Sequence, residues 1–80
     1  MRQIIQQSIR NSDDLVIEFR YCDAKGKSTR RVVSPIRFLG NNRFLGLCLS
    51  REEPRQFYLD RCEGGELKNA WDYVMPVAMN

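Results

Sequence analysis

The clearest signal of the fold is the segment Leu15-Val16-Ile17-Glu18-Phe19-Arg20-Tyr21-Cys22. Its larger apolar side chains recur at every second position, so Leu15, Ile17, Phe19 and Tyr21 fall on one face and the residues between them fall on the other. This period of two indicates a half-buried β-strand.

Turn signals and β-branched or aromatic runs follow this strand in alternation, as in a series of hairpins. Gly26 favours a hairpin loop at 23–27, and Pro35, inside the next extended segment, indicates a bulge, a bend or an edge position. Gly46 marks a close approach of another chain segment. The further strands are expected at Thr29–Leu39, Arg43–Leu49 and Arg55–Cys62, with turns at Gly40-Asn41-Asn42 and Glu63-Gly64-Gly65-Glu66.

Before the first strand, Met1–Ser12 has apolar residues at helical spacing, with glutamines and arginines facing away. We therefore expect a mainly β protein: a helix over about residues 1–12, then a small antiparallel barrel of four to five strands over about 14–68, and a tail over 69–80. Eighty residues suit one domain, and closing the sheet would remove its exposed edges.

The tail contains aromatic and apolar residues at helical spacing. Ala70, Trp71, Val74 and Met75 fit one apolar helical face that Pro76 would end. Trp71 with Tyr73 either caps the open end of the barrel or forms a stripe that binds a partner.

Positive charge is concentrated in the middle of the chain. Residues 20–61 carry eight Arg and two Lys against four acidic residues, a net charge of +6, whereas the flanking segments are mildly acidic. Ten of the thirteen basic residues are arginines, whose planar donors suit phosphate, carboxylate and base edges. The pattern favours an anionic partner.

Three ordered segments resemble the WYL-domain family over roughly Ile9 to Leu67. They are Leu15–Tyr21, Arg30-Arg31-Val32-Val33-Ser34-Pro35 and Arg55-Gln56-Phe57-Tyr58-Leu59-Asp60-Arg61, the last being similar to the family's R-x-F-x-L-D-R strand. Phe44-Leu45-Gly46 stands where the family usually has Trp-Tyr-Leu. The resemblance implies an Sm-like (SH3-like) barrel and a regulatory ligand-binding role of a bacterial-type WYL protein, and some members of the family bind single-stranded nucleic acid.

Ligand binding is assigned to arginines and one aromatic residue. Arg55 and Arg61 match the family's basic strand, and Arg30 or Arg31 matches the basic residue of the second strand. On a regular strand Arg55 and Arg61 would share a face. Phe57 is expected in the core, which leaves Tyr58 on the opposite face as a platform for base stacking. The alternative is that Asp60 and either Glu52 or Glu53 pair with these arginines and only close the barrel.

The sequence contains no histidine, so it lacks an imidazole base, a Ser-His or Cys-His nucleophile and a histidine metal ligand. The three cysteines are widely spaced, which suggests neither a disulfide framework nor a zinc site. We expect no enzymatic activity, no metal and no cofactor.

No apolar run reaches the roughly 20 residues needed to cross a bilayer and no signal peptide is recognisable, so we expect a cytoplasmic protein with no membrane partner. The favoured function is a regulatory module that binds single-stranded nucleic acid or a nucleotide-like anion. The alternatives are a protein-interaction subunit, with a protein partner or as a homodimer, and a sensor of a small anionic metabolite.

Overall fold

The computed structural model describes residues 1–49 and 52–73 of the chain, and in this part the protein is mainly β with one N-terminal helix. The expected fold class is confirmed, although several boundaries differ. The elements, in chain order, are α1 (Arg2–Arg10), β1 (Leu15–Cys22), β2 (Ser28–Leu39), β3 (Arg43–Cys48), β4 (Glu53–Tyr58), the 3-10 turn η1 (Leu59–Arg61), β5 (Cys62–Asn69) and the 3-10 turn η2 (Ala70–Asp72).

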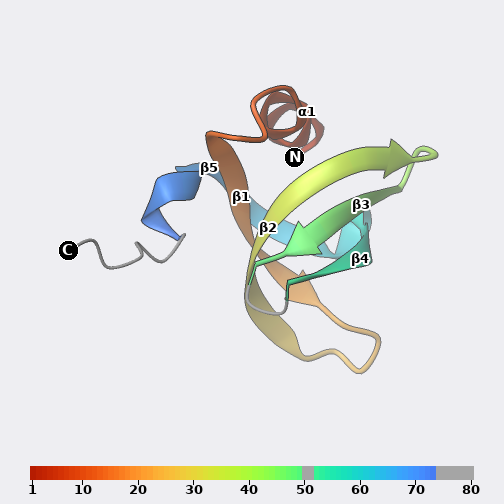
Figure 1. Ribbon diagram of the computed structural model, residues 1–80. Coiled ribbons are helices and arrows are strands. Elements are labelled where there is room, and N and C mark those ends of the chain that lie inside the picture. The colour runs from red at the N-terminus through yellow and green to blue at the C-terminus, as the bar shows by residue number, and fades with distance from the viewer. Residues whose placement is uncertain (50–51, 74–80) are drawn as a thin grey trace.

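The strands form one antiparallel sheet in the order β4-β3-β2-β1-β5. The long β2 bends strongly, so that β3 and β4 curve toward β1 while the β1–β2 hairpin extends beyond them (Figure 1). The two edge strands, β4 and β5, are not paired with each other in the described residues, so the sheet is curved and open. The expected closure into a barrel is therefore wrong, because η1 connects the edges by a turn and not by a hydrogen-bonded ladder.

Aromatic side chains from β1, β3 and β4 fill the concave face of the sheet. The Phe19 ring lies 6.1 Å from that of Phe44 and 5.5 Å from that of Phe57, and all three side chains are buried. Tyr21 contacts Phe57 edge to face at 5.2 Å, and its hydroxyl accepts a hydrogen bond of 3.1 Å from the backbone N–H of Tyr58. This cluster joins the middle of the sheet to the β4 edge. It also confirms that Phe57 is a core residue.

The helix α1 lies across one end of the sheet (Figure 1), and it is shorter than the expected 1–12 because the chain turns at Asn11. Its buried residues, Ile5 and Ser8, face the sheet. The Ser8 hydroxyl donates a hydrogen bond of 2.8 Å to the carbonyl of Leu15, so the one buried polar side chain in the described residues is satisfied. Helix and first strand are thereby fixed relative to each other.

Two expectations about the C-terminal half are wrong. The strand predicted at Arg55–Cys62 ends at Tyr58, because the next three residues form η1. The turn predicted at Glu63–Glu66 lies inside β5, where the register against β1 shifts between Glu18 and Arg20. The glycine pair supplies a β-bulge: Gly64 has a φ of +64°, and Gly65 packs against the start of α1.

The interpretation of Pro35 is confirmed, since the register between β2 and β3 shifts between Pro35 and Arg37. Of the two residues expected to cap the barrel end or bind a partner, Trp71 is 69% exposed among the described residues, which does not fit a cap. Tyr73 instead folds back toward β1, where its hydroxyl bonds to Glu18. The proposed partners of Trp71 on a helical face, Val74 and Met75, and the stop at Pro76 lie outside the described residues.

Gly46 lies where β3 crosses the bend of β2, and the close approach predicted there is confirmed. A Cβ at this position would overlap Cγ1 of Val33 and lie 3.3 Å from the Phe44 ring. Both neighbours are fully buried and cannot move into solvent. The site requires glycine for space.

We therefore predict that Gly46→Ala lowers the free energy of unfolding by about 1–3 kcal/mol through overpacking. In a Val33→Ala background the new methyl group occupies vacated space, so the second substitution should cost less by at least about 0.5 kcal/mol. Chemical denaturation of the four proteins measures this coupling. Strictly additive losses would contradict the assigned contact.

Candidate functional site

The sheet separates the predicted arginines onto two faces. Arg31 is opposite Phe19 in the β1–β2 register and Arg55 is opposite Gly46 in the β3–β4 register, so both lie on the concave face that carries the core. Arg31 is half-buried and its Nε donates a hydrogen bond of 3.1 Å to the Thr29 hydroxyl, whereas Arg55 is exposed. Neither forms an ion pair with a described carboxylate.

Tyr58 and Arg61 meet on the other side of β4. Phe57 points into the core, so Tyr58 points outward and is 40% exposed. The Arg61 guanidinium carbon lies 5.3 Å from the centre of the Tyr58 ring, within cation–π distance. A continuous strand would have placed Arg61 on the face of Arg55; the turn η1 instead brings it back over Tyr58.

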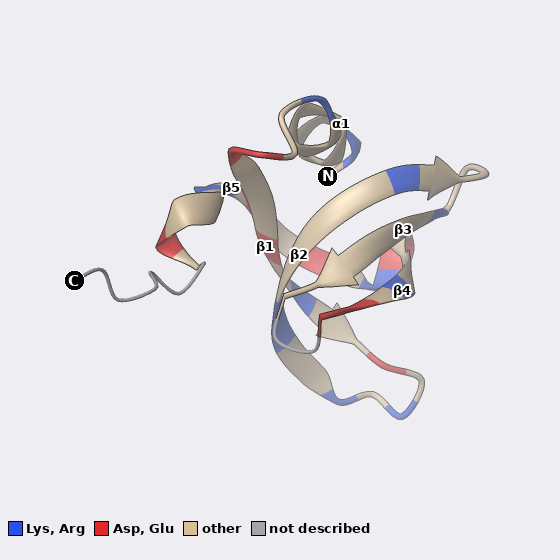
Figure 2. Ribbon diagram, in the orientation of Figure 1, with Lys and Arg blue, Asp and Glu red and all other residues tan. Residues whose placement is uncertain are grey.

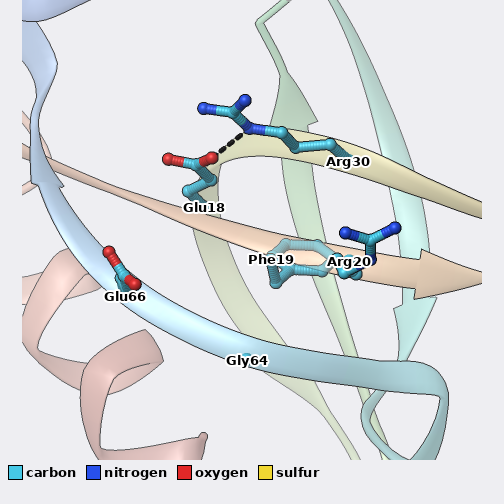
Figure 3. Close-up of a pocket in the computed structure, with 6 residues that line it drawn as sticks. All are labelled: Glu18, Phe19, Arg20, Arg30, Gly64 and Glu66. Atoms are coloured by element: carbon cyan, nitrogen blue, oxygen red, sulfur yellow. Dashed lines mark hydrogen bonds and ion pairs between the residues drawn. The ribbon is translucent and has the colours of Figure 1, made fainter.

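Arg30 lies apart from this pair, on the outer face of the β1–β2 ladder. It stands directly opposite Arg20, a juxtaposition of like charges that costs free energy. Glu18 offsets this cost through an ion pair with the Arg30 Nε, at the wall of a pocket of about 250 Å³ that Arg20, Gly64 and other residues complete (Figure 3). Arg30 is therefore the one predicted site residue that a described carboxylate already holds.

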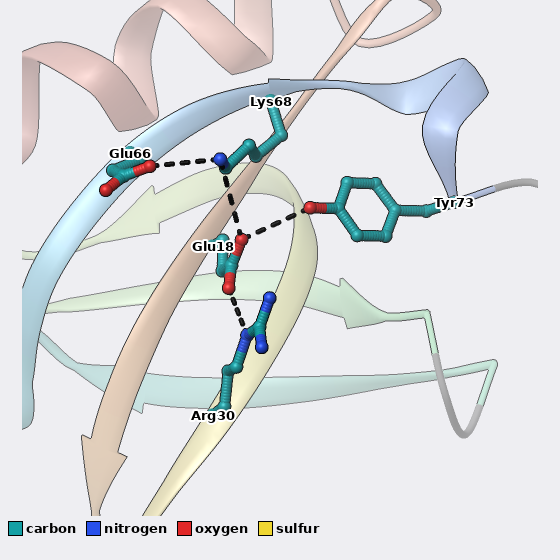
Figure 4. Close-up of polar contacts among 5 residues, drawn as sticks. All are labelled: Glu18, Arg30, Glu66, Lys68 and Tyr73. Carbon is teal, nitrogen blue, oxygen red and sulfur yellow. Dashed lines mark hydrogen bonds and ion pairs between the residues drawn. The ribbon is translucent and has the colours of Figure 1, made fainter.

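Glu18 also interacts with two residues from the C-terminal part of the chain, Lys68 and Tyr73 (Figure 4). Its Oε1 accepts a hydrogen bond of 3.2 Å from the Tyr73 hydroxyl and lies 3.9 Å from Nζ of Lys68, which in turn contacts Glu66 at 3.1 Å. The Glu18 side chain is only 15% exposed. One carboxylate thus connects β2, β5 and the residues after η2.

The ionisation of these groups follows from their contacts. The hydrogen bond from Arg30 lowers the pKa of Glu18 against the opposing effect of burial, and Tyr73 and Lys68 lower it further. Burial raises the pKa of the Tyr73 phenol, and its bond to Glu18 adds to that shift. The hydrogen bond to Glu66 raises the pKa of Lys68. Near neutral pH, Glu18 is therefore an anion and Tyr73 a neutral donor.

The thiol nearest to the Tyr58–Arg61 pair is Cys62. Burial raises its pKa to about 12, and the charge of Asp60 adds to this shift. The thiol donates a 3.3 Å hydrogen bond to the Tyr58 carbonyl. Because the thiolate is the nucleophilic form, this cysteine is an inert structural group at neutral pH.

The alternative set of ion pairs is not found: Asp60, Glu52 and Glu53 pair with no arginine among the described residues. Sequence reasoning missed the partner that Arg30 does have, Glu18. The available signal was its position on the polar face of the first strand, but naming its partner also required the β1–β2 register.

The described part of the chain contains no group of three or more His, Cys, Asp or Glu side chains placed to hold a metal ion. None of its helices combines the length and apolar character needed to cross a lipid bilayer.

The fold is that of a small, mainly β domain with several exposed arginines. Residues 3–67 match the family model for the WYL domain, so the chain belongs to the WYL-domain family. Such domains are commonly regulatory and ligand-binding, which indicates a regulatory role here.

Among solved structures, the chain is similar to the proteasome accessory factor B/C (PafBC) of Arthrobacter aurescens, with 31% sequence identity and a TM-score of 0.69. The match covers 84% of this chain and 11% of that one, so it concerns one domain of a much longer protein. No match was found among curated proteins.

The contacts of Glu18 predict how the stability of the fold depends on pH. Its pKa in the folded protein lies below the ordinary value of 4.5, so its contacts stabilise the fold above that pH and are lost as the pH falls through the lowered pKa. Glu18→Gln should therefore lower the thermal unfolding temperature at neutral pH, and this difference from wild type should shrink in acid. Thermal scans across pH measure it.

Glu53→Gln is the control, because Glu53 is exposed, lies opposite the uncharged Cys48 in the β3–β4 register and forms no ion pair with a described residue. It should change the unfolding temperature little at any pH. A Glu18→Gln difference that stays constant down to strong acid would show that the carboxylate charge is not what matters.

Proposed function

We propose that this protein is a non-catalytic regulatory module that binds single-stranded nucleic acid or a nucleotide-like anion through Tyr58 and Arg61, with Arg30, Arg31 and Arg55 adding positive charge around them. The observation that carries the proposal is the exposed Tyr58 ring with the Arg61 guanidinium against it. Such a pair offers a base a stacking surface and its phosphate a neighbouring cation.

The charge distribution supports an anionic ligand. Arg55 and Arg61 are exposed and form no ion pair with a described carboxylate, so their positive charge is available to a ligand. Arg30 differs, because a ligand would have to compete with Glu18 for it. Arg31 and Arg55 lie on the concave face, and we assign them to the field that attracts the ligand and Arg61 to direct contact.

The preference for single strands follows from the shape of the domain. The helix α1 does not protrude as a major-groove recognition helix would, because it buries Ile5 and Ser8 against the sheet. An exposed aromatic residue beside arginines instead suits bases that are free to stack.

A specific observation favours a second candidate, a protein-interaction subunit. Trp71 is 69% exposed. A tryptophan on the surface of a protein often marks a site where another protein binds. Salt separates the two functions: binding through phosphates weakens steeply as the salt concentration rises, and binding through an apolar surface does not.

The test is a fluorescence-anisotropy titration of a labelled single-stranded oligonucleotide. Tyr58→Ala should cost roughly 1–3 kcal/mol of binding with little change in the salt dependence. Arg61→Ala should weaken all sequences alike and reduce the slope of log K against log salt by about 0.7. Lys25→Ala, at the tip of the β1–β2 hairpin, removes the same charge away from the site and should bind like wild type.

Circular dichroism must first show that each variant is folded. If wild type binds no oligonucleotide at low salt, or if folded Tyr58→Ala and Arg61→Ala bind as well as wild type, the proposed site is wrong. The interaction role of Trp71 then takes its place.

A further inference from the structure

The face that carries Tyr58 also carries two arginines that lie outside the three segments that resemble the WYL-domain family. In the β3–β4 register Arg43 lies opposite Tyr58, and in the β2–β3 register Leu39 lies opposite Arg43 and Arg37 lies opposite Leu45. Residues opposite each other in a ladder project to the same side, and residues two apart on a strand do likewise. Arg37 and Arg43 therefore share the outer face with Tyr58.

On β2 and β3, this part of the outer face carries positive charge alone. Of the four arginines in these two strands, Arg37 and Arg43 lie on it, and neither strand contains an Asp or Glu (Figure 2). Arg43 Nη1 donates a hydrogen bond of 2.9 Å to the side-chain carbonyl of Gln56, a neutral acceptor that orients the guanidinium without cancelling its charge. Arg37 is exposed and forms no ion pair with a described carboxylate.

The cations are also spread out. Neighbouring strands lie about 4.8 Å apart, so β2 to β4 spans roughly 10 Å before the turn that carries Arg61 is added. Half-buried Leu39 and Leu45 lie between the charged residues and add apolar surface. A single phosphate cannot contact all of these arginines at once, whereas a chain of phosphates can.

We propose that Arg37, Arg43 and Arg61 form a continuous track on the outer face that binds successive phosphates of one single-stranded polynucleotide, while a base stacks on Tyr58. The inference rests on the proposed function and adds that the ligand is a chain and not a mononucleotide. The pocket beside Glu18 and Arg30 is not part of this track.

The first experiment compares a labelled mononucleotide with single strands of four and eight nucleotides under identical low-salt conditions. If the ligand lies along the track, affinity rises from the mononucleotide to the four-nucleotide strand by at least tenfold. The mononucleotide, which reaches only the Tyr58–Arg61 end, should bind weakly.

The second experiment measures the salt dependence of the eight-nucleotide strand for Arg37→Gln, Arg43→Gln and the control Lys25→Gln. Each track substitution should reduce the slope of log K against log salt by about 0.7, the value for one phosphate contact in a single strand. Lys25→Gln should leave the slope unchanged. Arg43→Lys should retain the slope, because it keeps the charge.

Failure of the track differs from failure of the proposed function. A mononucleotide that binds as tightly as the eight-nucleotide strand overturns the track and leaves the Tyr58–Arg61 site standing. The same conclusion follows if Arg37→Gln and Arg43→Gln leave the slope of log K against log salt unchanged while Arg61→Gln weakens binding of the eight-nucleotide strand. Wild type that binds none of these ligands overturns both. Equal affinity for an oligo-glutamate peptide of the same charge overturns the assignment to nucleic acid.

Discussion

The structure depends on the packing of three aromatic rings, Phe19 of β1, Phe44 of β3 and Phe57 of β4. They come from three different strands and bury one another. A domain of 80 residues has few large side chains with which to build a core. Placing these rings on the concave face forces the sheet to curve. The same alternation that turns Phe57 inward turns Tyr58 outward, so the core and the candidate site are two consequences of one strand.

Because the sheet is curved, its two faces carry different kinds of side chains. Aromatic residues and α1 occupy the concave face, which also carries Arg31 and Arg55. The outer face holds Glu18 and its partners over β1 and β5, and the basic track over β2 to β4. β2 and β3 carry arginines and no acidic residue, whereas each of the other three strands carries both signs, a difference that a count of total charge does not reveal.

Much of this architecture follows from the sequence. The period of two located β1 to the residue, and Gly46 and Pro35 were interpreted correctly from their positions in strands. The 3-10 turn at Leu59–Arg61 was missed because its residues continue an alternating pattern. Gly64-Gly65 was taken for a turn because a turn and a bulge use the same conformational freedom of glycine. The track was missed because Arg37, Arg43 and Tyr58 come together only through cross-strand register.

The hydrogen bond from the Tyr58 N–H to the Tyr21 hydroxyl has a further consequence for an open sheet. Backbone groups of alternate strand residues point to opposite edges, so Pro54 and Gln56 face the same free edge as Tyr58. Proline has no N–H to donate, and that of Tyr58 is already occupied. Only Gln56 can then offer a backbone donor along the whole free side of β4. A foreign strand that approached this side would find few backbone donors, which disfavours pairing between the β4 edges of two copies of the protein.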